Sequence, residues 1–296
     1  MTVRIGINPI TWTNDDLPAL GGDTPLETCL AEARQAGYAG IELGNKFPRR
    51  AETLRPILDR HGLALISGWY SGRLLERSVD EEIAAVEDHL ALLAALGCKV
   101  MVFAETTGGI GDDRGTKLSR RPVLAAGDWN DFAAKLTEIA EHLRRRGVAM
   151  AFHHHMGTVV ETPDEIDRLM ALAGPAVGLL LDTGHLAYAG GDPLAIARRH
   201  IARINHVHCK DVRRAVLERM RAADTSFLDA VVEGVFTVPG DGAIDYAPLF
   251  AVLKEAGYQG WLVVEAEQDP AKAHPLTYAR LGYRYLNATA AEAGLV

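Results

Sequence analysis

Four segments in the second half of the chain share one pattern, an apolar run that ends in a side chain able to bind a metal ion. They are Val148 to His155, Val177 to His185, Arg203 to Asp211 and Gln259 to Glu267. Short apolar runs of this kind are typical of parallel strands buried on both faces. The candidate ligands, one from each segment, are His153, Asp182, His208 and Glu265.

Two nitrogen and two oxygen donors would suit Mn²⁺, Co²⁺, Fe²⁺ or Zn²⁺ better than Mg²⁺ or Ca²⁺, which prefer oxygen ligands. Side chains alternate along a strand, so His153 and His155 share one face and His154 points to the helical layer or the rim. A divalent cation held there could act as a Lewis acid on a carbonyl group.

Each candidate also has a structural interpretation. Asp182 precedes Thr183 and could simply cap a helix. We expect His206, which shares a face with His208, to fill the barrel interior with its ring bonded to a backbone group rather than to a metal. Four such strand ends on four consecutive strands nevertheless favour a metal site.

Further polar and aromatic residues lie at or beyond predicted strand ends. His185 is expected one turn beyond Asp182, in contact with substrate or with a ligand. Lys210 could bind a substrate oxygen, or it could form an ion pair with Asp211. The remaining candidates could reach a substrate as polar contacts or apolar walls, with surface charge or core packing as the alternatives; they are Trp12, Glu42, Lys46, Trp69 and Glu105.

The elements that would position these residues alternate regularly along the chain. Four more strands are expected in the first half, at Val3 to Asn8, Ala39 to Leu43, Leu63 to Trp69 and Cys98 to Ala104. Segments of helical period separate the strands, and no GxGxxG turn follows the first strand. Eight strands alternating with helices predict a parallel (β/α)8 TIM barrel, with the strand ends at one face.

The helices are expected at Thr24 to Ala36, Arg49 to His61, Asp80 to Leu96, Asp128 to Arg146, Thr162 to Ala173, Asp192 to Ala202, Tyr246 to Ala256 and Pro275 to Leu286. Two longer connections, at about 106–127 and 211–242, interrupt the alternation. The first is expected to cover the barrel mouth, and the second to be partly helical around Val216 to Arg221. We therefore expect one barrel domain over residues 1–296, with these two inserted loops.

Composition excludes several classes of protein. The chain has 296 residues, 48% of them hydrophobic, and a net charge of −8, which argues against a nucleic-acid partner. No apolar run is long enough to span a membrane, and Met1 to Asn8 resembles no export leader. The three cysteines have no paired spacing, so a cytoplasmic protein without disulfides is expected, with a homo-oligomer left open.

Several longer strings carry a family resemblance. DTGH, HVHCKD and GDGAIDYAPLFAVLKEAGYQGWLVVE resemble the xylose-isomerase-like barrel superfamily, which holds a divalent ion at the barrel mouth. Within it, NPITWTNDDLPALGG, GIELGNKFPR, FHHHMGT and GVFTVPGDG are similar to the inosose dehydratase family. The resemblance implies a metal-dependent hydro-lyase that removes water from 2-keto-myo-inositol in inositol catabolism, giving a trihydroxycyclohexane-dione. It also implies Mn²⁺ or Co²⁺ as the metal, and glutathione as a further cofactor.

One ligand departs from the superfamily pattern. The superfamily usually has Glu where this chain has His153, whereas Asp182, His208 and Glu265 match. The change removes one of the two metal-bound glutamates that isomerases and epimerases of this fold use as bases, which argues against sugar isomerisation.

Dehydration next to a ketone requires a base for the α-proton and an acid for the leaving hydroxyl, and histidine can serve either step. We assign His155 as the base, with Glu105, His185 or Lys210 binding hydroxyls or protonating the leaving group. The main alternative is a metal-dependent keto-sugar isomerase or epimerase. A nuclease of this fold would need several metal ions and a basic surface, which the net charge of −8 does not favour. A non-catalytic sugar-binding barrel would need no metal ligands, so the intact ligand set argues against it.

Overall fold

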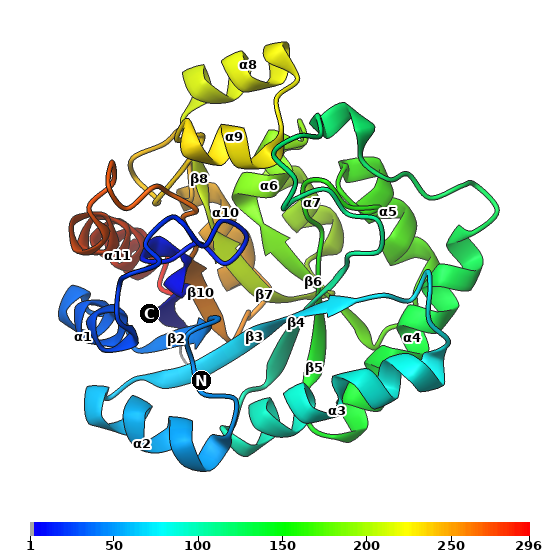
Figure 1. The fold of residues 1–296 in the computed structure, drawn as a ribbon, viewed down its shortest axis with the longest axis horizontal. Helices are drawn as coiled ribbons and strands as arrows, with labels where there is room; N and C mark the ends of the chain where they lie inside the picture. Colours follow the sequence, from blue (N-terminus) through cyan, green and yellow to red (C-terminus); the bar gives the residue numbers. More distant parts are fainter. Residues whose placement is uncertain (1–2) are drawn as a thin grey trace.

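The eight predicted strands form a closed barrel in the computed structural model, which describes residues 3–296 (Figure 1). All neighbours are parallel, in the order β1-β10-β7-β6-β5-β4-β3-β2. The strands are β1 (Arg4–Ile7), β2 (Gly40–Leu43), β3 (Ala64–Gly72), β4 (Val100–Glu105), β5 (Ala149–His153), β6 (Val177–Asp182), β7 (Ile204–Cys209) and β10 (Trp261–Val264). The prediction of a TIM barrel is confirmed.

The barrel strands are apolar because both of their faces are buried. Along β6, Leu180 packs inside the barrel with Val102 and Ala151, whereas Leu179 and Leu181 join the larger core. That core extends to the surrounding helices, so alternate residues of one strand belong to two different clusters.

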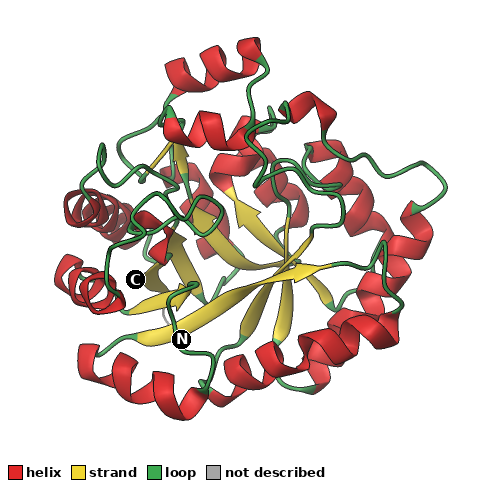
Figure 2. Ribbon diagram, in the orientation of Figure 1, coloured by secondary structure: helices red, strands yellow, loops and turns green. Residues whose placement is uncertain are grey.

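Most of the helices surround the barrel on its outer side (Figure 2), and two belong to the second insertion, residues 211–242. The helices are α1 (Leu26–Ala36), α2 (Ala51–His61), α3 (Val79–Ala95), α4 (Trp129–Arg145), α5 (Pro163–Leu172), α6 (Thr183–Tyr188), α7 (Pro193–His200), α8 (Arg214–Ala223), α9 (Phe227–Val232), α10 (Ala247–Glu255) and α11 (Pro275–Glu292). Two short 3-10 turns, η1 (Pro9–Thr11) and η2 (Leu118–Arg120), lie in loops. None of the helices in residues 3–296 is both long and apolar enough to cross a membrane.

Several boundaries differ from those expected. β3 continues three residues past Trp69, to Gly72, because its end pairs with the end of β4. α11 runs beyond Leu286 to Glu292, and Ala290 on this extension is fully buried. The short helix α6 was not predicted. Met1 and Thr2, which begin the segment for which no export leader was expected, lie outside the described residues.

The second insertion, residues 211–242, contains more structure than predicted. Besides α8 it holds α9 and a small antiparallel pair, β8 (Asp211–Val212) and β9 (Phe236–Thr237). Buried apolar residues of this unit, including Phe227 and Phe236, form a second cluster together with Met156 and Tyr188.

The two insertions contact each other at the barrel mouth (Figure 1). Arg114 of the first insertion, residues 106–127, donates a hydrogen bond of 2.6 Å to Asp229. The Ser119 hydroxyl lies 2.7 Å from the Asp224 carboxylate. Segments more than 100 residues apart in the sequence therefore meet above the strand ends.

Candidate active site

The structure brings the four predicted metal ligands together at the carboxyl ends of consecutive barrel strands. His153 and Asp182 end β5 and β6, His208 lies near the end of β7, and Glu265 follows β10. One donor atom from each residue lies within 4.8 Å of the others, and all four side chains are buried. Asp182 and His208 are opposite one another in the β6–β7 register, so the barrel itself sets their spacing.

Hydrogen bonds on the far side of each histidine ring leave one nitrogen facing this cluster. His153 Nδ1 lies 2.6 Å from the carbonyl oxygen of His154, which requires Nδ1 to donate and leaves Nε2 as an acceptor. His208 Nε2 lies 3.2 Å from Glu42 Oε1, which leaves Nδ1 as the acceptor. Partners of this kind fix the tautomer of metal-binding histidines.

The inward-facing atoms of the cluster make no regular hydrogen bond among the described residues, and two of them, His208 Nδ1 and Glu265 Oε2, lie in direct contact with each other. They are His153 Nε2, Asp182 Oδ2, His208 Nδ1 and Glu265 Oε2. Buried polar groups without partners are costly, and four that converge on one point would be satisfied by a cation. The donor set is suited to a divalent metal ion. The assignment of each ligand stays a prediction.

The position of Asp182 is compatible with both roles considered for it. Its Oδ1 accepts a 2.8 Å hydrogen bond from the backbone N–H of His185 and so caps α6. Its Oδ2 lies 3.5 Å from His208 Nδ1 and 3.6 Å from His153 Nε2. The cap and the predicted metal site therefore involve different oxygens of one carboxylate.

Glu42 lies beneath the cluster rather than at the cavity. Its carboxylate accepts hydrogen bonds from Asn8, Ser67, His206 and His208. Burial alone would raise the pKa of Glu42, but the two histidines hold it well below the ordinary value. The prediction that the His206 ring bonds to a backbone group was wrong, since His206 Nε2 lies 2.9 Å from Glu42 Oε1.

Lys210 is fully buried behind the ligands. Its ammonium lies 2.8 Å from Glu267, 2.8 Å from His185 Nε2 and 3.2 Å from Glu265. Burial would lower the pKa of Lys210, but Glu265 and Glu267 raise it. The alternative of an ion pair with Asp211 is wrong, because Asp211 instead accepts backbone hydrogen bonds that hold the loop before α10.

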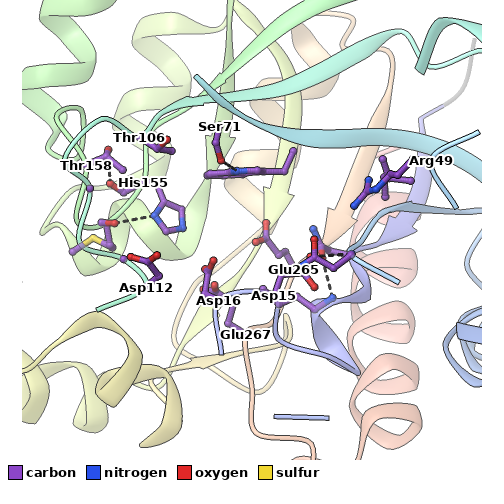
Figure 3. A pocket seen from close by; sticks show the side chains of 18 residues that line it. Asp15, Asp16, Arg49, Ser71, Thr106, Asp112, His155, Thr158, Glu265 and Glu267 are labelled. Carbon is purple, nitrogen blue, oxygen red and sulfur yellow. Dashed lines mark hydrogen bonds between the residues drawn. The ribbon is translucent and has the colours of Figure 1, made fainter. Parts of the chain in front are cut away.

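A cavity of about 400 Å³ opens above the cluster (Figure 3). Glu265, one of the four predicted ligands, forms part of the cavity wall and so connects the cavity to the cluster. His155 and Trp69 border it as predicted, and Trp69 is 40% exposed. Residues at the wall that were not predicted include Asp15, Asp16, Asn45, Arg49, Asp112 and Glu267.

His155 presents one ring nitrogen to this cavity (Figure 3). Its Nδ1 lies 2.8 Å from the carbonyl oxygen of Met156 and so must donate, which leaves a lone pair on Nε2. The ring packs against Trp69 and, with centroids 4.0 Å apart, against His185. Burial, helped by the charge of Lys210, lowers the pKa of His155 to about 4.

Three other predicted contacts do not border the cavity. Trp12 is buried, with its Nε1 donating to Glu32 at 2.6 Å. Lys46 turns outward, and its ammonium bonds to the carbonyl oxygens of Gly22 and Thr24. Glu105 accepts backbone hydrogen bonds from Leu74 and Thr107. Each of these side chains holds a loop after a strand in this arrangement.

His185 is also enclosed rather than open to the cavity. It is 1% exposed, lies between the His155 ring and Phe227, and bonds to Lys210. The cavity residues missed from the sequence are polar side chains of loops that follow strands, and the run Asn14 to Asp16 was a usable signal for them.

Known proteins resemble this chain over nearly its whole length. A family model described as xylose isomerase-like TIM barrel matches residues 30–289. The rhizopine catabolism protein MocC of Rhizobium meliloti is 56% identical, over 99% of this chain and 90% of that protein. An inosose dehydratase of Geobacillus thermodenitrificans is 44% identical, over 97% of each.

A solved structure, the IOLI protein with a binding zinc atom, has a TM-score of 0.70 and 18% identity. The match covers 98% of this chain and 99% of that chain, and supports the fold alone. The chain therefore belongs to the xylose isomerase-like TIM-barrel family and, within it, to the group that includes the inosose dehydratases.

Proposed function

We propose that the protein is a metal-dependent hydro-lyase that removes water from 2-keto-myo-inositol to give a trihydroxycyclohexane-1,2-dione. The observation behind this proposal is the set of four unpartnered donor atoms beside a polar cavity, with a neutral histidine at its edge. Several relatives at 42% to 44% identity are named inosose dehydratase. The substrate is accordingly a small cyclic keto-polyol.

His153, Asp182, His208 and Glu265 would hold the metal, for which we propose Mn²⁺ or Co²⁺. When bound, the cation supplies Lewis acidity that stabilises negative charge developing on the substrate ketone oxygen. We assign no role to glutathione.

The side chains at the cavity divide the remaining work. His155 Nε2 accepts the proton next to the ketone, because its lone pair faces the cavity and the Met156 carbonyl holds the ring in place. Trp69 offers an apolar wall to the ring carbons. Burial raises the pKa of Glu267 to about 7, so its carboxyl group can carry a proton at neutral pH. Because Glu267 borders the cavity, whereas Glu105, His185 and Lys210 do not, its protonated form replaces them as the candidate proton donor to the leaving hydroxyl.

Lys210 acts through its neighbours rather than on the substrate. Its ammonium contacts Glu265 and Glu267 from behind, and so orients both carboxylates at the cavity edge. His185 supports the other side of the site, because its ring packs against the base His155.

The test is ultraviolet absorbance after mixing metal-stripped protein with 2-keto-myo-inositol, alone and with Mn²⁺ or Co²⁺ restored. Dehydration predicts absorbance from an enolised dione that appears only with metal. No absorbance, with the metal shown to be bound, would contradict the proposal. It would favour the isomerase or epimerase alternative, which releases no water and forms no dione.

The name of the 56% identical relative suggests a second substrate, a compound of rhizopine catabolism. The two substrates are separated by offering each to the metal-loaded protein and comparing kcat/KM. A higher kcat/KM for 2-keto-myo-inositol supports the first assignment, and the reverse order supports the second.

A further inference from the structure

Glu42 is a buried carboxylate that contacts a predicted metal ligand from outside the cluster. It is 2% exposed and belongs to β2, whereas His208 belongs to β7. β1 and β10 separate these two strands around the barrel, so the 3.2 Å contact between Glu42 Oε1 and His208 Nε2 crosses the barrel interior. The other ring nitrogen, His208 Nδ1, faces Asp182 and Glu265. Glu42 therefore lies behind this ligand, on the side away from the predicted metal position.

Three further donors hold the Glu42 carboxylate in place. Asn8 Nδ2 donates to Oε2 at 2.7 Å, and the Ser67 hydroxyl donates to Oε1 at 2.6 Å. His206 Nε2 lies 2.9 Å from Oε1. Both oxygens therefore accept hydrogen bonds, as expected of an ionised carboxylate.

The negative charge of Glu42 is not offset by a basic side chain. In the described part of the chain neither Lys nor Arg forms an ion pair with Glu42, whose partners of this kind are the rings of His206 and His208. His206 Nδ1 makes no hydrogen bond, which is the arrangement of an uncharged ring. Glu265 differs, because the Lys210 ammonium lies 3.2 Å from its carboxylate and competes with a metal for its charge. The charge of Glu42 therefore acts on His208 in a buried region, where electrostatic effects are strong.

We propose that Glu42 is a positioning residue for the metal ion: it keeps the proton of His208 on Nε2, turns Nδ1 toward the cluster and places a negative charge behind that ligand, and so raises the affinity for a divalent cation. The inference rests on the metal site of the proposed function and gives a role to a residue outside that site. A histidine that donates its second ring N–H to a carboxylate is a stronger metal ligand, because the ring is more basic and keeps its orientation. The corresponding partner of His153 is the uncharged carbonyl group of His154.

The side chains of Glu42, His206 and His208 are also close enough to hold an ion of their own. Their hydrogen bonds argue against this use, because both oxygens of Glu42 and the Nε2 atoms of both histidines already have partners. An ion at that place would have to displace those bonds. The number of ions bound per chain therefore separates a positioning residue from a ligand.

The test measures the binding of Co²⁺ to the metal-stripped protein by calorimetry, which gives both the Kd and the number of ions bound. Glu42→Gln keeps the shape and one acceptor oxygen of the side chain but removes its charge. We expect its Kd for Co²⁺ to rise about 10- to 100-fold, with one ion still bound per chain. A role in folding alone would lower the stability of the metal-free protein, but would not change the Kd of the folded variant.

Glu82→Gln is the matched control, because Glu82 is also buried and its partners, including Tyr70 and Arg73, are not predicted ligands. Its Kd should equal that of the wild type. Glu42→Asp serves if Glu42→Gln does not fold. Its carboxylate keeps the charge but withdraws from His208, so the Kd should rise by a smaller factor.

Wild-type affinity in the folded Glu42→Gln variant, or in Glu42→Asp where only that variant folds, would overturn the inference. Two ions bound by the wild type and one by Glu42→Gln would also overturn it, because Glu42 would then be a ligand itself. No binding of Co²⁺ to the wild type would overturn both the inference and the metal site. Metal binding that depends on Glu42, without dehydration of 2-keto-myo-inositol, would support the inference and contradict the proposed activity.

Discussion

His155 is the predicted catalytic residue whose position the structure supports most directly. The Met156 carbonyl assigns the proton to Nδ1, and Trp69 and His185 hold the ring from two sides. Nε2 is therefore the nitrogen left to face the cavity. The sequence shows only that His155 lies two residues after the predicted ligand His153. The hydrogen bond to the Met156 carbonyl determines which ring nitrogen can accept a proton.

Replacing His155 by Ala should lower kcat about 10²- to 10⁴-fold, because the proton acceptor is lost. Metal content, measured by elemental analysis of the purified protein, should not change, since the four ligands remain. His274→Ala is the control, because His274 is exposed at the start of α11. Turnover retained by the His155→Ala variant would remove His155 from the mechanism.

At the scale of elements, the connection between β5 and α5 supports the first insertion. The N–H of Ile110 donates to the carbonyl oxygen of Gly157 at 3.1 Å, next to where Gly109 and Gly111 border the cavity. Gly157 has a φ of +80°, and a Cβ there would lie 3.1 Å from the Gly111 nitrogen. This close contact holds Asp112 at the mouth. That the insertion closes as a cover stays a prediction.

Gly157→Ala should displace residues 106–127, raise KM for the substrate and increase trypsin cleavage after Arg114 or Lys117. Gly97→Ala is the matched control: Gly97 has a similar φ of +84°, and a Cβ there would meet nothing within 4 Å. Both changes should cost about 1–2 kcal/mol of stability from the left-handed backbone. If Gly97→Ala also raises KM and cleavage to the same extent, the contact with the insertion has no part in the effect.

At the scale of the whole molecule, the proposed metal site would join four barrel strands that are separated in the sequence. A cation bound there stabilises the folded state, because the unfolded chain does not assemble the ligands. At a metal concentration about 1,000 times the Kd, the gain is about 4 kcal/mol. Urea unfolding with and without Mn²⁺ should show this difference.

Asp182→Asn tests whether the gain comes from the predicted ligands. Asparagine can still cap α6 through its side-chain oxygen, but it lacks the negative charge that the metal needs. We expect most of the metal-dependent stabilisation to disappear in this variant. Identical unfolding of the wild-type protein with and without metal would contradict the site itself.

The order of elements could be predicted from the sequence because it depends on local patterns. Apolar runs such as Val177 to Leu181 alternate with helical periods, and parallel strands joined by helices close into one barrel. Strand ends then gather at one face, so a ligand type at each end was enough to group His153, Asp182, His208 and Glu265. The helix α9 and the β8–β9 pair were not predicted, because the 211–242 segment has a less regular pattern and these elements are stabilised by a small cluster that also includes Met156 and Tyr188.

The tertiary structure alone decided which polar side chains remain free. Lys46, Trp12 and Glu105 lie near strand ends, but each is used by a nearby loop, while Lys210 is enclosed by Glu265, Glu267 and His185. Asp16 and Asp112 come from two loops that meet only after the barrel has closed. Residue type and spacing determine what chemistry is possible at a strand end, whereas the hydrogen bonds a side chain makes depend on partners distant in the sequence.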